Sequence, residues 1–160
     1  MEHSRKTGIS FGITSATITT LGLMVGLESS TQSKLVVIGG VFTIAIADAF
    51  SDALGIHISE ESENIHSHKE IWIATTFTFL AKLIFALTFA VPILLLNLTT
   101  AIFINIIYGL TLLSFFSLYI AKNQGFRQRL GVMFEHLSIA IIVIIITHYV
   151  GHLIQLIFNK

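Results

Sequence analysis

The fold class follows from the stretch IWIATTFTFLAKLIFALTFAVPILLL, residues 71–96. One charged residue, Lys82, interrupts this otherwise uncharged run. About 20 apolar residues are enough to cross the ~30 Å hydrocarbon core of a bilayer as an α-helix. The stretch therefore predicts a transmembrane helix.

Four further apolar stretches have comparable lengths. They cover approximately residues 8–27, 35–58, 101–121 and 130–158. Of the 160 residues, 54% are hydrophobic and 11% are charged, whereas soluble domains carry about 25% charged residues. The sequence predicts an all-α integral membrane protein, with five transmembrane helices in one domain over residues 1–160 and no separate soluble domain. The apolar run after Lys6 is too long for a cleaved signal peptide and lacks a cleavage motif.

Charge and cysteine content exclude several classes of function. The formal net charge is zero, so the chain has no basic surface for nucleic acid. It contains no cysteine, which excludes disulfides, thiolate metal sites and cysteine nucleophiles.

The distribution of cations between the loops predicts the orientation, because cytoplasmic loops carry an excess of Lys and Arg. With a cytoplasmic N-terminus, that side holds Arg5, Lys6, Lys69, Lys122, Arg127 and Arg129. The other side holds only Lys34 and Lys160. We therefore expect the N-terminus in the cytoplasm and the C-terminus on the opposite side, in a prokaryotic cell membrane.

Small residues form a stripe along the first predicted helix. They are Gly8, Gly12, Ser15, Thr19, Gly22 and Gly26. Their spacing of four and three residues places them on one helix face, where two backbones can approach closely within lipid. Two alternatives follow: packing within one subunit, or the interface of a two-fold homodimer.

Ionisable residues inside the predicted spans are candidates for function, because each costs about 2.5–3.5 kcal/mol near the bilayer centre. Asp48 and Asp52 are four residues apart, on one face of the second span. A rise of 1.5 Å per residue gives Asp48 and Lys82 nearly the same depth, so we expect an Asp48–Lys82 ion pair. Asp52 and Glu135 are shallower, and no cation of a neighbouring span matches their depth. We expect them to bind a transported cation or proton, or else to line a water-filled vestibule.

The loop after the second span, SEESENIHSHKE, supplies further candidate metal ligands. These are Glu60, Glu61, Glu63, His66 and His68. Carboxylate and imidazole groups suit Mn²⁺ and Fe²⁺, although a solvated acidic loop is the commoner role for such a segment. His148 and His152 could hold metal or haem, but a hydrogen-bonded role in packing is the favoured interpretation for two histidines on one helix.

The order of these features resembles the vacuolar iron transporter family, also called the VIT-like iron/manganese transporters. SFGITSATITTLGLMVGL is similar to that family's first helix, and AIADAFSDALGIHISEESEN to its second. Pro92, and Tyr149 and Gly151 in THYVGHLI, fit the third and fifth helices. The resemblance covers nearly the whole chain. It implies five helices, a homodimer formed largely through the first helix, and exchange of Fe²⁺ or Mn²⁺ for protons.

The chain also departs from the family pattern. The family's metal-handling aspartate of the first helix corresponds to Ser15, and its second-helix methionine to Asp52. A glycine is replaced by Asp48 and a glutamate by Ile56, while the helical metal-binding insertion is reduced to the short loop. The resemblance therefore implies the scaffold but not the same ion site.

Together these observations predict a divergent VIT-like transporter of a divalent cation, by proton exchange, and not an enzyme. Asp48, Asp52 and Glu135 would form the ion site within the membrane, with the loop acids and histidines at its cytoplasmic mouth. No permanently bound cofactor is expected; the partners are lipid, the divalent cation, the proton and a second copy of the chain. The alternative is a non-transporting scaffold or a subunit of a larger membrane complex.

Overall fold

The structure is a computed structural model that describes residues 1–158, so Lys160, one of the cations used to predict the orientation, lies outside the described residues. Over these residues the chain is helical. The helices are α1 (Glu2–Thr31), α2 (Lys34–Ser62), α3 (His68–Thr88), α4 (Ala90–Leu95), α5 (Leu98–Ile120) and α6 (Phe126–Phe158). With α3 and α4 counted together, five helical segments are long and apolar enough to cross a membrane. The predicted all-α fold with five spans is confirmed, and the chain is an integral membrane protein.

Polar residues fix where several of the helices begin. The side chain of Ser33 accepts a hydrogen bond from the backbone N–H of Val36 at the start of α2. Ser67 and Glu70 form a reciprocal capping box at the start of α3, and Asn97 caps α5. The helices begin before the predicted apolar runs, because backbone hydrogen bonding continues into the polar sequence that precedes them.

The predicted span 71–96 is not one continuous helix. It breaks at Phe89, three residues before Pro92, because proline has no N–H to donate to the preceding turn. Residues of α5 stabilise the break. Asn105 donates from Nδ2 to the carbonyl oxygen of Phe89 at 2.9 Å, and the Tyr108 hydroxyl lies 3.0 Å from that of Thr88.

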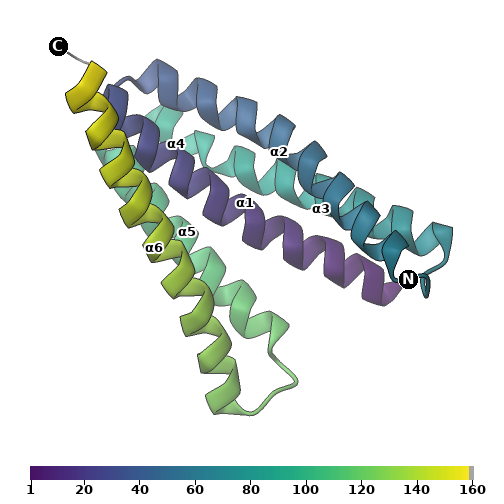
Figure 1. Ribbon diagram of the computed structural model, residues 1–160. Helices are drawn as coiled ribbons and strands as arrows, with labels where there is room; N and C mark the ends of the chain where they lie inside the picture. Colours follow the sequence, from purple (N-terminus) through teal and green to yellow (C-terminus); the bar gives the residue numbers. More distant parts are fainter. Residues whose placement is uncertain (159–160) are drawn as a thin grey trace.

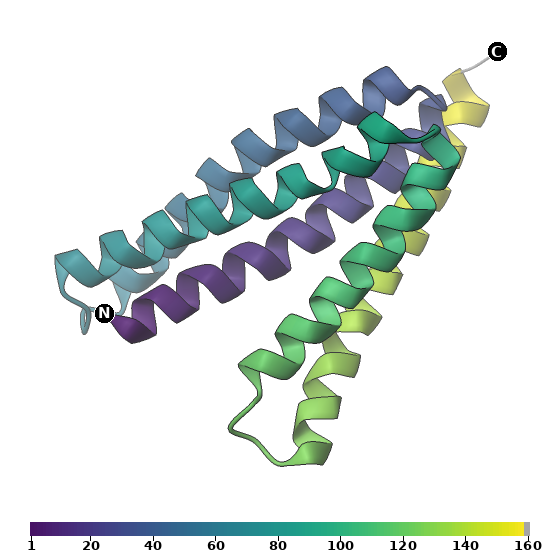
Figure 2. The same cartoon turned by 180° about the vertical axis from the view of Figure 1, so that it is seen from behind.

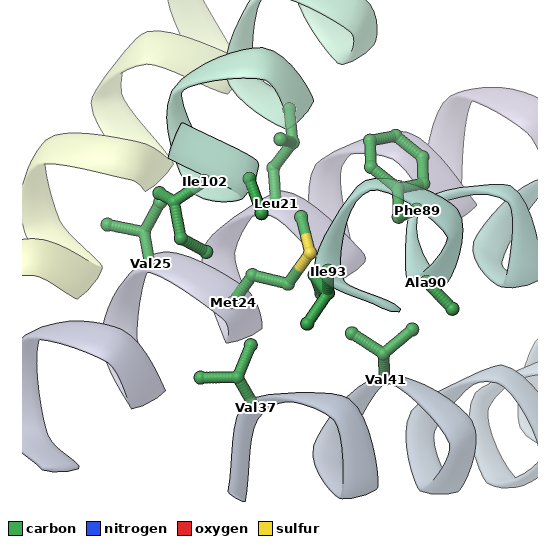
Figure 3. Close-up of a cluster of buried hydrophobic side chains, with 10 residues drawn as sticks. Leu21, Met24, Val25, Val37, Val41, Phe89, Ala90, Ile93 and Ile102 are labelled. Carbon is green, nitrogen blue, oxygen red and sulfur yellow. The ribbon is translucent and has the colours of Figure 1, made fainter. Parts of the chain in front are cut away.

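The helices form two arms that meet at one end. Helices α1, α2 and α3 lie side by side, whereas the α5–α6 hairpin diverges from them toward the end that carries the N-terminus (Figures 1 and 2). Buried apolar side chains fill the end where the arms meet, among them Leu21, Met24, Val41, Phe89 and Ile93 (Figure 3). Helix α1 packs against both arms, since it contacts α3 in one arm and α6 in the other.

The glycine stripe of α1 packs within the chain. A Cβ atom at Gly8 would lie 2.5 Å from the carbonyl oxygen of Ala74, and one at Gly12 would lie 2.8 Å from that of Thr78, both on α3. Gly22 and Gly26 face α6: a Cβ atom at Gly22 would lie 2.8 Å from Val143 Cγ1, and one at Gly26 would lie 3.4 Å from the carbonyl oxygen of Thr147.

These contacts correct the expectation of a dimer interface on this stripe. Its closest surfaces already meet α3 and α6, so a second copy could not use them without displacing those helices. Of the other two members, Ser15 turns toward α2 and α3, and half-buried Thr19 donates to the carbonyl of Ser15. The spacing indicated that a helix approaches closely, but not which helix.

Candidate functional site

Lys82 is the most deeply buried charged residue of the described chain, with 1% of its side chain exposed. It extends from α3 toward α1 and α2. Its Nζ lies 2.5 Å from Asp48 Oδ2, donates to Asp52 Oδ2, and donates to Ser15 Oγ at 2.6 Å. We call Lys82, Asp48 and Asp52 the charged triad.

Local helix geometry brings the triad together. Asp48 and Asp52 lie one turn apart on the same face of α2, so one ammonium group can contact both carboxylates. On α1, Gly12 allows close approach, because a Cβ there would lie 3.1 Å from the backbone nitrogen of Lys82. Ser15, almost one turn further along α1, donates from Oγ to Asp52 Oδ2 at 2.6 Å. Three helices therefore contribute to one polar cluster.

The charges of the triad do not cancel. One ammonium and two carboxylates leave one formal negative charge when all three groups are ionised. The carboxylates are also more accessible than the amine, since the side chains of Asp48 and Asp52 are 23% and 18% exposed. The contact to Asp48 has the distance of an ion pair but not the direction of a hydrogen bond. This arrangement suits a proton or another cation as an additional partner of the carboxylates.

The structure contains the predicted Asp48–Lys82 contact, but the expectation that Asp52 lacks a cation is wrong. The depth argument counted residues along the helix axes and ignored the long, flexible lysine side chain. Because Asp52 is one turn from Asp48, Nζ reaches both carboxylates at once. The contribution of Ser15 was missed as well: the small-residue stripe pointed to packing, and the resemblance marked Ser15 only as the position of a lost aspartate.

Glu135 does not join this cluster. It is exposed near the start of α6, in a shallow groove that also includes Gln124 and Gln128. That part of α6 belongs to the arm that diverges from α2 (Figure 1). The prediction that Glu135 shares an ion with Asp52 is therefore corrected: similar depth in the membrane does not bring two helices together.

The candidate metal ligands of the loop are not gathered into one site. His66 Nε2 lies 3.4 Å from Glu60 and 3.2 Å from Glu63. His68 instead accepts a hydrogen bond at Nε2 from Trp72, and Glu61 is exposed. Within residues 1–158 no group of three or more His, Asp or Glu side chains has the geometry of a metal site. Asp48 and Asp52 could still contribute two oxygen ligands to a cation.

Three histidines within the spans form hydrogen bonds to hydroxyl groups. His148 Nδ1 lies 2.7 Å from Ser29 Oγ, which agrees with the packing role favoured for it. His136 Nδ1 lies 2.8 Å from Ser117 Oγ, and His57 Nδ1 lies 2.9 Å from Thr75 Oγ1. Each bond joins two neighbouring helices.

No protein-family model, curated protein or solved structure matches the chain. The resemblance to the VIT-like transporters therefore stays a prediction from the motifs.

Proposed function

We propose that the protein is a membrane transporter that exchanges a divalent cation for protons at the charged triad. One observation carries the proposal: a buried ammonium shared by two more accessible carboxylates, with one negative charge in excess. Ionisable groups inside membrane spans are expensive, and they commonly mark ion and proton pathways. A purely structural ion pair needs only one carboxylate per lysine.

Charge balance suggests how exchange would proceed. In the proton-loaded state, charged Lys82, one ionised aspartate and one protonated aspartate together are neutral. When a divalent cation binds both carboxylates, neutrality requires two protons to leave, one from the protonated carboxyl group and one from the ammonium of Lys82. The freed lone pair on Lys82 Nζ and the oxygen of Ser15 would then both lie near the cation that the two carboxylates hold. The proposed exchange is one divalent cation for two protons.

The ligand chemistry favours a hard or borderline divalent cation. Carboxylate and hydroxyl oxygens suit Mn²⁺ and Fe²⁺ and offer no thiolate to Zn²⁺ or Cu⁺. The loop cations favour the N-terminal end of the bundle on the cytoplasmic side of a prokaryotic cell membrane. The resemblance to VIT-like transporters supports the same class of cargo and an assembly of two copies.

A second candidate, a non-transporting scaffold, is favoured by the hydrogen bonds of Ser15. Ser15 joins α1 to Asp52 of α2 and to Lys82 of α3, so the cluster also clamps three helices. A clamp of this kind would stabilise the arm without moving an ion.

Transport by purified protein in proteoliposomes separates the two candidates. We expect an outward-directed proton gradient to drive Mn²⁺ uptake, and Asp52→Asn to slow uptake at least about tenfold because a charged ligand is lost. Glu135→Gln, which removes an exposed carboxylate from the other arm, is the matched control and should transport normally. A pH dye inside the vesicles should record two protons lost per Mn²⁺ gained, with no effect of an imposed membrane potential. Wild-type vesicles that take up neither Mn²⁺ nor Fe²⁺ would support the scaffold instead.

A further inference from the structure

A groove of about 410 Å³ runs along the junction of α2 and α3, outside the charged triad. Its walls are mainly apolar and include Phe50, Leu54 and Phe79, while His57, Trp72 and Thr75 lie toward the end near the loop between the two helices. Seven residues separate Phe50 from His57, so the groove extends about 10 Å along the helix axis. Its volume falls in the range of about 300–1,000 Å³ typical of small-molecule sites.

Hydrogen bonding determines which nitrogen of His57 carries the proton. The hydroxyl of Thr75 donates to the carbonyl of Ile71 at 2.8 Å, so its proton is not available to His57. Thr75 Oγ1 therefore accepts from Nδ1–H of His57, at 2.9 Å. In the neutral ring, Nε2 is then unprotonated and acts as a hydrogen-bond acceptor. The imidazole of His57 and the ring of Trp72 also form a T-shaped contact, with centroids 4.9 Å apart, which helps to hold the imidazole at the groove.

The mouth of the groove carries charges of both signs. Glu61 follows His57 by four residues, and Lys69 precedes Trp72 by three, so each lies on the groove face of its helix one turn closer to the loop. Both residues are exposed, and neither forms an ion pair within the described part of the chain. The apolar groove therefore holds an acceptor nitrogen near its loop end, and a carboxylate and an ammonium lie about one helical turn beyond it.

We propose that this groove binds a phospholipid with a primary ammonium headgroup, phosphatidylethanolamine. The headgroup ammonium donates to His57 Nε2 and faces Glu61, the phosphate faces Lys69, and one acyl chain follows Phe50 and Phe79. A choline headgroup has the same net charge but no N–H donor, so it cannot form the bond to His57. This inference does not depend on the transport activity, because none of the groove residues belongs to the charged triad and the binding can be tested without an ion.

The chain offers a direct reporter, because Trp72 is its only tryptophan and lines the groove. The full chain is reconstituted in phosphatidylcholine bilayers, and lipids with dibrominated acyl chains are added to quench Trp72. We expect brominated phosphatidylethanolamine to bind about fivefold more tightly than brominated phosphatidylcholine, the effect of one additional hydrogen bond. Equal quenching by the two lipids would mean that the groove holds any acyl chain, and would overturn the proposal.

Two comparisons test whether His57 forms the hydrogen bond to the lipid headgroup. In the wild type, the preference should persist for mono- and dimethylated ethanolamine headgroups, which keep an N–H donor, and vanish with the third methyl group. His57→Phe keeps a ring at the position and should abolish the preference, whereas His152→Phe, an exposed histidine of α6, should leave it unchanged. A preference that survives in His57→Phe, or that falls steadily with each methyl group, would contradict the assignment to His57.

Discussion

Replacing Asp48 and Asp52 together by asparagine should lower the free energy of unfolding by about 3–5 kcal/mol, because Lys82 becomes a buried ammonium without a counter-ion. Either substitution alone should cost much less, since the remaining carboxylate still contacts Nζ. The two changes are therefore expected to be strongly non-additive. Reversible unfolding of the purified protein in mixed micelles, with increasing SDS, measures all three variants.

The control for these substitutions removes the amine of Lys82 as well. Adding Lys82→Met to the double variant should restore most of the lost stability, because no charge is then buried in the cluster. Lys82→Met alone should be damaging, since it leaves two adjacent carboxylates without a cation. Additive losses from the two asparagine substitutions, or no recovery in the triple variant, would show that the three residues do not share one electrostatic contact.

Gly151→Ala should destabilise the protein by about 1–3 kcal/mol, the usual cost of overfilling a packed site. Gly151 is buried where α6 crosses α1, and a Cβ atom there would overlap the carbonyl oxygen of Gly26 and lie 2.9 Å from Cβ of Ser29. A backbone atom cannot move aside as a flexible side chain can, so the two helices must separate. The separation should also break the bond between Ser29 and His148, which NMR of the histidine ring nitrogens would detect.

Gly131 provides the matched control on the same helix. Nothing lies within 4 Å of a Cβ atom placed there, so Gly131→Ala should be neutral or stabilise by up to about 1 kcal/mol through helix propensity. Thermal unfolding in detergent compares the two variants. Equal effects of the two substitutions would show that α1 and α6 are not in close contact at Gly151.

The sequence predicted the spans well because a bilayer selects for length and apolarity, which can be read residue by residue. The break at Phe89 was not predicted, although Pro92 is its evident cause, because proline within a transmembrane helix produces a kink or a break according to its neighbours. Here Asn105 and Tyr108 supply the partners of the broken turn, and no local pattern links either residue to Phe89.

Helix neighbours were harder to predict than helices. In a soluble protein the apolar face of a helix indicates the core, but α6 is apolar toward lipid and protein alike and buries only Ala140 and Gly151. Glu135 was consequently assigned to the wrong arm, and the spacing of the α1 glycines could not decide between packing within one subunit and a homodimer interface. The Asp48–Lys82 contact could be anticipated because a charge in the membrane restricts the choice of partners far more than an apolar residue does.

The divergence of the α5–α6 hairpin gives the protein a tapered outline within the bilayer (Figure 2). Near the meeting point of the arms the helices occupy one compact cross-section, whereas toward the N-terminal end two separate groups of helices displace lipid over a wider area. Each molecule therefore occupies a larger area in one leaflet than in the other. Lateral pressure in the leaflet at the wider end acts to push the arms together, so the lipid packing of that leaflet contributes to the energy of the angle between them.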